Sequence, residues 1–536
     1  MASYSTKSLD HLGLVSGMNK ELGVAKLIDS ALPEQSDDKL ISYGQLVEAM
    51  ILNGLGFVGR TLHMYPEYFK DRPVERLLGK GIKAEYINDD ALGRCLDQLY
   101  ETGVSDIYQT LSASVIEHLG LPCEGINLDS TSIHVDGNYA HDDDSKAIKL
   151  VRGYSRDHRP ELNQVVLNLI TENKAGIPVY MQAASGNIND NQGFKNIVKH
   201  HINSLKAAQD CQYFIADAAL YTTETIQSLD EQKQLFISRA PQKLKQVKAA
   251  IANQHALTFE SLNNGYSGAW LTSEYGDVKQ RWLLICSEQA KKREQHTLDK
   301  RMEKGSSVAL KSFKKLCRQR FSCSLDADKA LKIWLKSHEE IIAMSDSEIL
   351  KHGVFKQSGR PKLNQQPDSY EYQITGQLFS VLSNRQQLLQ EKGLFMLATN
   401  DLSDTLTMEK MLSLYKSQQS VEKGFRFLKS PDFLTSSLYL KKPERIEALL
   451  MVMTCCLMVY AALEHKMRRE LKAQSVYFPN LKYKPCQDPT ARWVFFCFQG
   501  VHVLTVSEER QLVLNIEDRH KIIINSMGSI YQQIYS

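Results

Sequence analysis

Residues 126–135 read INLDSTSIHV, and the sequence changes character at this stretch. Before it, residues 1 to about 120 have apolar side chains at helical spacing, which predicts an all-helical N-terminal domain. After it, QVVLNLITENKAGIPVYMQAA (164–184) and CQYFIADAAL (211–220) are short runs rich in Val, Ile, Tyr and Thr, which predict strands. GLFMLATND (393–401) predicts a further strand that precedes two helical segments. This order predicts one α/β core with an insertion in its middle.

The composition is that of a globular protein, with 43% hydrophobic and 24% charged residues among 536. A chain of this length has room for about two to four domains. The longest apolar run, Ala448 to Leu463, has 16 residues, fewer than the roughly 20 that span a bilayer. We therefore expect a buried core helix there and no membrane partner. The start of the chain has no apolar signal core, and the ten cysteines form no C-x-x-C pair. Both features favour a cytoplasmic protein without disulfides or a zinc site.

Charge is distributed unevenly along the chain. Residues 1–124 contain 11 Lys/Arg and 18 Asp/Glu, whereas Lys291–Arg320 contains 11 basic and 3 acidic residues. A basic block of this kind is either a solvated helical face or a surface for a polyanion, because neutralised phosphates release counterions.

Two aspartates lie at positions where strands rarely place them. Asp129 lies within a run of β-formers, where aspartate is disfavoured, and Asp217 ends the apolar run Tyr213–Ala216. A carboxylate at the end of a buried strand needs a hydrogen bond, a cation or a metal to offset its desolvation. Each aspartate alone is also compatible with a turn or a helix N-cap.

A third carboxylate, Glu422, lies in YKSQQSVEKGFRFLK (415–429), a segment that we expect to be helical. Tyr415, Glu422 and Lys429 are seven residues apart, and seven helical steps are only about 20° short of two full turns. In one continuous helix these three side chains would share a stripe. Three carboxylates can orient a pair of Mg²⁺ ions for in-line phosphoryl transfer.

These segments together resemble the bacterial insertion-sequence DDE transposases, which have an RNase H-like catalytic core. The resemblance depends on INLDSTSIHVDGNY, GYSRDHRPELNQVVLNLI, YFIADAALYT, YKSQQSVEKGFRFLKSPDF and KKPERIEALL, and it extends to the N-terminal part, where HLGLVSGMNKELGVAKLID resembles the helical domain of one subgroup. The fold class that it implies is α/β. An RNase H-like mixed sheet is flanked by helices, with an all-helical N-terminal domain and an α+β insertion between the second and third catalytic carboxylates.

The resemblance implies catalytic roles for three residues. Asp129, Asp217 and Glu422 match the family's carboxylates, with separations of 88 and 205 residues, and would bind two Mg²⁺ ions, for which Mn²⁺ can substitute. Tyr415 and Lys429 match family positions that contact DNA. Gln418 stands where the family has Arg, so a fixed charge and a bidentate phosphate contact are missing. Arg426, or Lys423, is the nearby cation that we expect to replace it.

Further DNA contacts are expected from the loop after the first catalytic strand and from the basic block Lys291–Arg320. The loop residues are Arg152, Arg156 and Arg159, and the alternative for them is an ordinary solvated surface. The resemblance also implies double-stranded DNA partners, namely terminal inverted repeats and target DNA, and a homodimer in the synaptic complex.

The predicted function is cleavage at the inverted repeats of an insertion sequence and joining of the 3′ ends to target DNA. Two alternatives stay open: an RNase H-fold nuclease without strand transfer, and a non-catalytic transposase-derived DNA-binding protein. The predicted domains are a helical domain at 1–122, the core at 123–225 and 393–472, the insertion at 226–392 and a tail region at 473–536.

Overall fold

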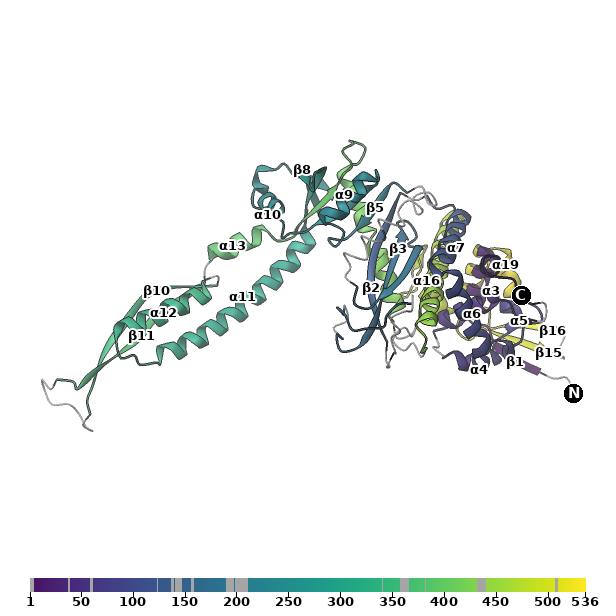
Figure 1. The fold of residues 1–536 in the computed structure, drawn as a ribbon, viewed down its shortest axis with the longest axis horizontal. Helices are drawn as coiled ribbons and strands as arrows, with labels where there is room; N and C mark the ends of the chain where they lie inside the picture. Colours follow the sequence, from purple (N-terminus) through teal and green to yellow (C-terminus); the bar gives the residue numbers. More distant parts are fainter. Residues whose placement is uncertain are drawn as a thin grey trace. The chain divides into compact units, whose positions relative to one another are not determined.

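The computed structural model describes residues 4–36, 39–57, 61–122, 124–135, 139, 147–155, 159–188, 197, 211–339, 341–356, 366–380, 382–430, 440–506 and 510–536 (Figure 1). The chain forms two compact units. Unit 1 combines Met1–Arg239, Ser273–Arg281 and Ala398–Ser536, and unit 2 combines Ala240–Thr272 and Trp282–Leu397. Unit 1 therefore contains all three predicted catalytic carboxylates.

The N-terminal part of unit 1 is helical, as predicted, apart from one short strand, β1 (Tyr4–Ser8). Two of its helices begin at side-chain caps. Ser42 accepts a hydrogen bond from the Gln45 amide in a capping box, and Asn88 accepts one from the Ala91 amide. The helices are α1 (Leu12–Leu22), α2 (Val24–Ala31), α3 (Tyr43–Leu55), α4 (Tyr65–Lys70), α5 (Val74–Leu78), α6 (Asp89–Thr102) and α7 (Val104–Leu119).

The core of unit 1 contains a mixed sheet with the strand order β4-β3-β2-β5-β6. The strands are β2 (Gly125–Val135), β3 (Asn163–Glu172), β4 (Pro178–Ser185), β5 (Tyr213–Ala216) and β6 (Leu235–Ala240). β3 pairs antiparallel with β2 and β4, whereas β5 pairs parallel with β2 and β6. Helix α9 (Thr223–Glu231) connects β5 to β6. The predicted fold class, a mixed α/β sheet flanked by helices after a helical N-terminal region, is confirmed.

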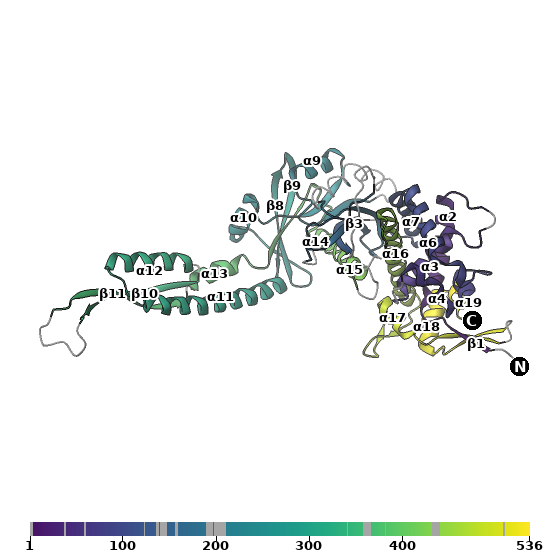
Figure 2. The ribbon, with the colours of Figure 1, turned by 60° about the horizontal axis from the view of Figure 1, so that its bottom comes forward.

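The last segment of unit 1, Ala398–Ser536, begins with two short helices and one long helix. They are α14 (Met408–Lys416), α15 (Gln419–Leu428) and α16 (Pro443–Ala473). α16 is the one described helix that is long and apolar enough to cross a membrane by length and composition, yet 78% of its most apolar window is buried. It packs against α1, α3, α6 and α7 (Figures 1 and 2). The predicted buried core helix is confirmed.

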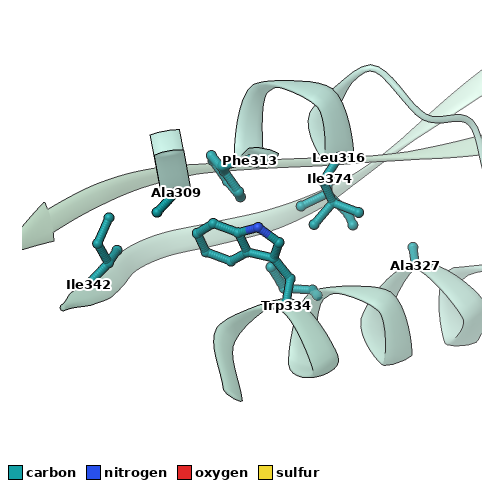
Figure 3. Packing of buried hydrophobic residues seen from close by; sticks show 8 residues of the cluster. Ala309, Phe313, Leu316, Ala327, Trp334, Ile342 and Ile374 are labelled. Carbon is teal, nitrogen blue, oxygen red and sulfur yellow. The ribbon is translucent and has the colours of Figure 1, made fainter. Parts of the chain in front are cut away.

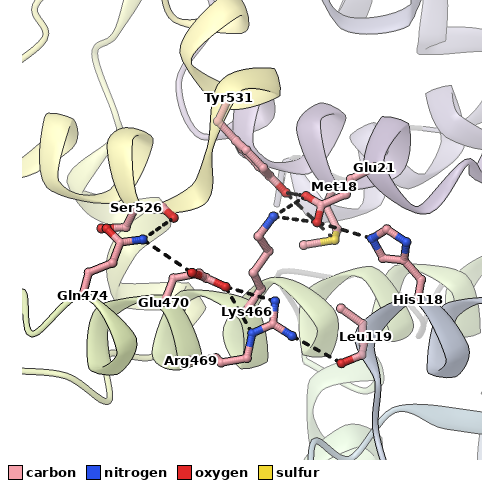
Figure 4. Close-up of polar contacts among 10 residues, drawn as sticks. All are labelled: Met18, Glu21, His118, Leu119, Lys466, Arg469, Glu470, Gln474, Ser526 and Tyr531. Atoms are coloured by element: carbon pink, nitrogen blue, oxygen red, sulfur yellow. Dashed lines mark hydrogen bonds and ion pairs between the residues drawn. The ribbon is translucent and has the colours of Figure 1, made fainter.

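The C-terminal region joins the N-terminal one through a small sheet and an ionic network. Strand β1 pairs antiparallel with β15 (His502–Val506), which pairs with β16 (Arg510–Leu514). The Lys466 ammonium of α16 contacts both carboxylate oxygens of Glu21 at 2.6 Å, and the Tyr531 hydroxyl donates to the same carboxylate at 2.9 Å (Figure 4). The remaining elements are β13 (Phe478–Pro479), β14 (Pro485–Cys486), α17 (Ala491–Cys497), α18 (Asp518–Met527) and α19 (Ser529–Ile534).

Unit 2 is α+β, as predicted for the insertion. The basic block lies on α11 (Glu288–Cys317), which packs with α12 (Ser324–His338) on the hairpin β10 (Ile342–Val354) and β11 (Ser369–Ser380). Trp334 of α12 lies 5.0 Å from Phe313 of α11, ring centroid to ring centroid, in the small core that these elements share (Figure 3). The other elements of unit 2 are α10 (Lys245–Ala252), β7 (Glu260–Leu262) and α13 (Leu382–Gln390). Three strands belong partly to each unit: β8 (Tyr266–Tyr275), β9 (Val278–Ser287) and β12 (Leu394–Thr399).

Cysteine chemistry differs from the prediction at one position. Cys211, directly before β5, is disulfide-bonded, so the expectation of a chain without disulfides is wrong there. The free cysteines include Cys455 and Cys456, which are buried in α16. Cysteine spacing alone did not indicate the bond, because a disulfide requires closeness in space rather than in sequence.

Candidate active site

The first two predicted carboxylates lie at neighbouring positions of two parallel strands: Asp129 is in β2, and Asp217 directly follows β5. Leu128 of β2 pairs with Ala216 of β5, so Asp129 and Asp217 occupy the next position on each chain. Adjacent strands are about 4.8 Å apart, which brings the two Cα atoms to roughly that separation. Both residues are partly exposed. The sheet therefore brings together two aspartates that are 88 residues apart in the sequence.

Local hydrogen bonds orient both aspartates. One carboxylate oxygen of Asp217 accepts from the Ala219 amide at 2.8 Å, and the Ser238 hydroxyl of β6 donates to the Asp217 carbonyl oxygen at 2.8 Å. The Ser130 amide donates to one carboxylate oxygen of Asp129, also at 2.8 Å. These bonds hold each carboxylate against the backbone that directly follows it.

A partly buried contact connects the residue pair between α14 and α15 to the same sheet. The Ser417 hydroxyl donates to the side-chain oxygen of Asn127 at 3.0 Å, and Asn127 lies two residues before Asp129 on the same face of β2. Helix α15 packs against β2 and β3. Glu422 is in the first turn of α15 and is exposed. The arrangement places the beginning of α15 beside the strand of Asp129.

The segment around Glu422 is not one continuous helix. α14 ends at Lys416 and α15 begins at Gln419, with Ser417 and Gln418 between them in right-handed helical conformation. The shared stripe of Tyr415, Glu422 and Lys429 therefore stays a prediction. The Ser417 hydroxyl is closer to the Leu414 carbonyl oxygen, at 2.6 Å, than to the Asn127 side chain, at 3.0 Å, and its one hydrogen is shared between these two contacts. A hydroxyl that bonds to its own preceding turn competes with helical hydrogen bonding, which is consistent with the break at this residue.

Tyr415 hydrogen-bonds to an arginine, Arg239, that the sequence did not indicate. Burial raises the pKa of the Tyr415 hydroxyl; Arg239, which hydrogen-bonds it, lowers that pKa, and the charges of Asp217 and Glu422 raise it. Tyr415 is therefore within electrostatic range of two of the three predicted metal ligands. Arg239 is in β6, whose neighbours Phe236, Ile237 and Ser238 are buried while Arg239 itself is exposed.

The remaining predicted DNA-binding residues differ in exposure. Gln418 is only 8% exposed and Lys429 is half-buried, whereas Arg426 and the alternative Lys423 are exposed. Arg152 and Arg159 are also exposed, and Arg159 forms an ion pair with Glu161. Arg156 lies outside the described residues. Arg239 is thus the guanidinium that lies next to Tyr415, and the roles of the others stay predictions.

The donor set is suited to Mg²⁺, which prefers carboxylate oxygens. Asp129 and Asp217 supply such oxygens from adjacent strands. Within the described part of the chain, however, no three His, Cys, Asp or Glu side chains lie close enough together to hold a metal ion. The structure therefore places Asp129 and Asp217 at neighbouring positions. That Glu422 is the third ligand stays a prediction.

Comparisons with known proteins identify the domain that contains these carboxylates. A family model described as a transposase DDE domain matches residues 124–459, more than half of the chain. A second model, described as a domain of unknown function, matches residues 4–113. No curated protein matches. The cryo-EM structure of a piggyBac transposase synaptic complex with hairpin DNA matches at a TM-score of 0.39 and 9% identity, over 93% of this chain and 82% of that one. A similarity at that TM-score supports no conclusion about the site.

Proposed function

The chain belongs to the family with a transposase DDE domain and is a DNA transposase, and from this premise we propose its reaction. It cleaves DNA at the terminal inverted repeats of its own element and joins the freed 3′ ends to target DNA by two-metal phosphoryl transfer. The observation that supports this best is the placement of Asp129 and Asp217 side by side on parallel strands inside the matched domain. We further propose a cytoplasmic homodimer at paired ends.

In the proposed reaction, Asp129, Asp217 and Glu422 would hold Mg²⁺, which when bound would activate the attacking oxygen and stabilise the leaving one. The chain's own residues position the DNA. Tyr415 and Arg239 form a hydrogen-bonded pair beside Asp217, and a guanidinium can bind a phosphate with two parallel N–H donors. Arg239 thus supplies the fixed charge that Gln418 lacks.

The direct test uses the full chain and a duplex that carries the inverted repeats flanking its gene. With Mg²⁺ we expect cleavage that leaves a 3′-hydroxyl, followed by joining of that end to a second duplex. Removal of divalent ions with EDTA should abolish both steps, and Mg²⁺ or Mn²⁺ should restore them. Cleavage without joining would favour the nuclease, and binding without cleavage in either metal would favour the non-catalytic DNA-binding protein.

Arg239→Gln is expected to slow cleavage about 10- to 100-fold, because a hydrogen bond to a charged group contributes about 1.5–3 kcal/mol. Single-turnover cleavage rates measure the effect. Arg239→Lys should recover part of the rate, since it keeps the charge but not the planar fork. Arg94→Gln, on the exposed surface of α6, is the matched control and should leave the rate unchanged.

The pair with Tyr415 can be tested by a double-mutant cycle. If the two residues act on one phosphate, Arg239→Gln combined with Tyr415→Phe should cost less than the product of the two single effects. If the loss of cleavage rate in the double variant equals the product of the two single losses, the two residues do not act on one phosphate. Arg239 would then be an independent surface contact.

The basic block on α11 is proposed to track DNA phosphates. Lys311, Lys314 and Lys315 are exposed, and their replacement by Gln is expected to lower the slope of log K against log salt by about 0.9 for each phosphate that the variant no longer neutralises. The control replaces the exposed lysines Lys39, Lys70 and Lys80 of the acidic N-terminal region. Equal slopes in all proteins would show that the block is only a solvated face.

A further inference from the structure

The turn between β13 and β14, Asn480–Lys484, presents two large apolar side chains to solvent. Leu481 is 72% exposed and Tyr483 is 80% exposed, and they alternate in the sequence with Lys482 and Lys484. Single exposed hydrophobic residues are ordinary on a protein surface. Here two of them lie on one five-residue turn between two lysines, which is a combination typical of nucleic-acid surfaces.

Hydrogen bonds within the turn define its conformation. The side-chain oxygen of Asn480 accepts from the amides of Lys482 and Lys484, at 2.8 and 3.1 Å. The Tyr483 amide donates to the Asn480 carbonyl oxygen at 2.8 Å. Tyr483 has a φ of 57°, in the left-handed region that a bulky residue rarely adopts. The turn therefore holds an aromatic ring in solvent at a cost in backbone strain.

The base of the same hairpin is anchored to the rest of unit 1. Phe478 of β13 is fully buried, and the Trp493 indole of α17 donates to the Pro479 carbonyl oxygen at 2.8 Å. Trp493 also stacks on Phe496, with ring centroids 5.6 Å apart, and Phe496 is exposed. The exposed aromatic surface thus continues from the hairpin onto α17. Because the hairpin is fixed before a partner arrives, the entropic cost of binding is lowered.

Helix α17 lies close to the helix that carries the third predicted carboxylate. Phe427 of α15 is 4.6 Å from Tyr460 of α16, and Tyr460 is 6.0 Å from Phe495 of α17, ring centroid to ring centroid. Phe427 is five residues after Glu422, or about 7.5 Å along a helix. One ring, that of Tyr460, therefore separates α17 from α15, and both helices belong to unit 1.

The positive charges of the turn are not compensated by nearby acids. Between residues 473 and 506, Asp488 is the one acidic residue in the sequence, and it pairs with Lys472 at 2.6 Å. Among the described residues, Lys482 and Lys484 form no ion pair, and both are exposed. The turn therefore carries two positive charges that a polyanion can neutralise.

The same features argue against a second protein chain as the partner. A specific protein interface buries about 800 Å² on each side and is depleted in lysine, whereas this turn has five residues, two of them uncompensated lysines. Base faces offer flat apolar surfaces next to phosphates, which matches a ring between two ammonium groups. In an intact duplex those faces are covered by neighbouring bases, so a protruding ring needs unpaired bases to stack on.

We propose that the turn Asn480–Lys484 binds DNA with unpaired bases. Tyr483 stacks on an exposed base, Leu481 packs beside it, and Lys482 and Lys484 contact the flanking phosphates. This inference rests on the proposed function for its DNA substrate but uses none of the cleavage chemistry. It adds a DNA-binding site in the C-terminal region, to which the sequence assigned no role.

The ring is tested with Tyr483→Asn, because asparagine adopts the left-handed conformation readily and keeps the turn while removing the ring. Fluorescence anisotropy with EDTA present measures binding of the full chain to a 20-nucleotide single strand of mixed sequence and to the same sequence as a duplex. We expect Tyr483→Asn to weaken single-strand binding about 5- to 100-fold and duplex binding much less. Tyr483→Phe keeps the ring and should bind like the natural chain. Tyr4→Ala, which removes a tyrosine that is 70% exposed in β1, is the matched control.

The lysines are tested with the double variant Lys482→Gln and Lys484→Gln. On the single strand, the slope of log K against log salt should fall by about 0.7 for each phosphate that is no longer neutralised. The control replaces two exposed lysines of the N-terminal region, Lys39 and Lys80, by Gln and should leave the slope unchanged. Thermal melts identify any variant that fails to fold.

Equal single-strand affinities of the natural chain and Tyr483→Asn would overturn the proposal, as would equal losses on the single strand and the duplex. Unchanged DNA binding together with a shift from dimer to monomer in sedimentation would also overturn it, and would identify the turn as a contact between two copies of the chain. Failure of the proposed function gives a different result, since it would appear as DNA binding without cleavage when Mg²⁺ is added.

Discussion

Asp129→Asn is expected to reduce Mg²⁺-dependent cleavage of end DNA by at least about 1,000-fold. Loss of a metal ligand removes several kcal/mol of transition-state stabilisation, and about 1.4 kcal/mol corresponds to a factor of ten in rate. Folding should be preserved, because the Ser130 amide that donates to Asp129 at 2.8 Å can donate equally to an asparagine oxygen. Single-turnover cleavage and gel-shift binding on the same duplex measure the two properties separately.

The control for this variant is Asp404→Asn, which changes an exposed carboxylate outside the site and should leave cleavage unchanged. Asp217→Asn should reproduce the loss, since Asp217 occupies the equivalent position on the adjacent strand. Binding that disappears together with cleavage would instead indicate a folding role for Asp129. Cleavage that persists in both variants would rule out the two aspartates as metal ligands.

The sequence predicted the elements whose pattern is local. The runs around Asp129 and Asp217 are strands in which β-branched and aromatic residues are frequent, and Asp217 directly follows its strand as expected. The apolar stretch of α16 was predicted to be a buried core helix because it is too short to span a membrane, and it is buried. The pairing of β1 with β15 could not be predicted, because it joins the two ends of the chain and neither strand contains a signal for its partner.

In the candidate site, too, the features with a local sequence pattern were predicted and those that depend on tertiary contacts were not. The carboxylates were predicted because aspartate is unusual in a strand, and the sheet register brought two of them together. Arg239 was missed because its contact with Tyr415 depends on how β6 and the end of α14 meet in space. The available signal was an arginine in LFISRA, an otherwise buried strand. The break at Ser417 was missed because serine also occurs within helices, so its bond to the Leu414 carbonyl oxygen has no signal in the apolar spacing.

Lys466→Met is expected to lower the free energy of unfolding by about 3–5 kcal/mol, because it leaves the Glu21 carboxylate buried without its cation. The side chains of Lys466 and Glu21 are only 11% and 13% exposed. The other partners of Glu21, the Tyr531 hydroxyl at 2.9 Å and the His118 ring nitrogen at 3.5 Å, cannot replace an ammonium that contacts both carboxylate oxygens at 2.6 Å. Because α1, α16 and α19 meet at this carboxylate (Figure 4), the N-terminal helices should loosen together with the C-terminal ones. Urea unfolding followed by hydrogen exchange of both regions measures this.

Charge burial and impaired packing can be distinguished by the double variant Glu21→Leu with Lys466→Met. Replacing a buried ion pair by apolar residues is often neutral, whereas removing one partner leaves an uncompensated charge. We therefore expect the double variant to recover most of the stability that Lys466→Met loses. Lys70→Met serves as the control, since Lys70 and Glu67 are 70% and 69% exposed at 3.8 Å and surface changes usually stay within about 0.5 kcal/mol. If the double variant is less stable than the single one, the network contributes through packing and not through its charges.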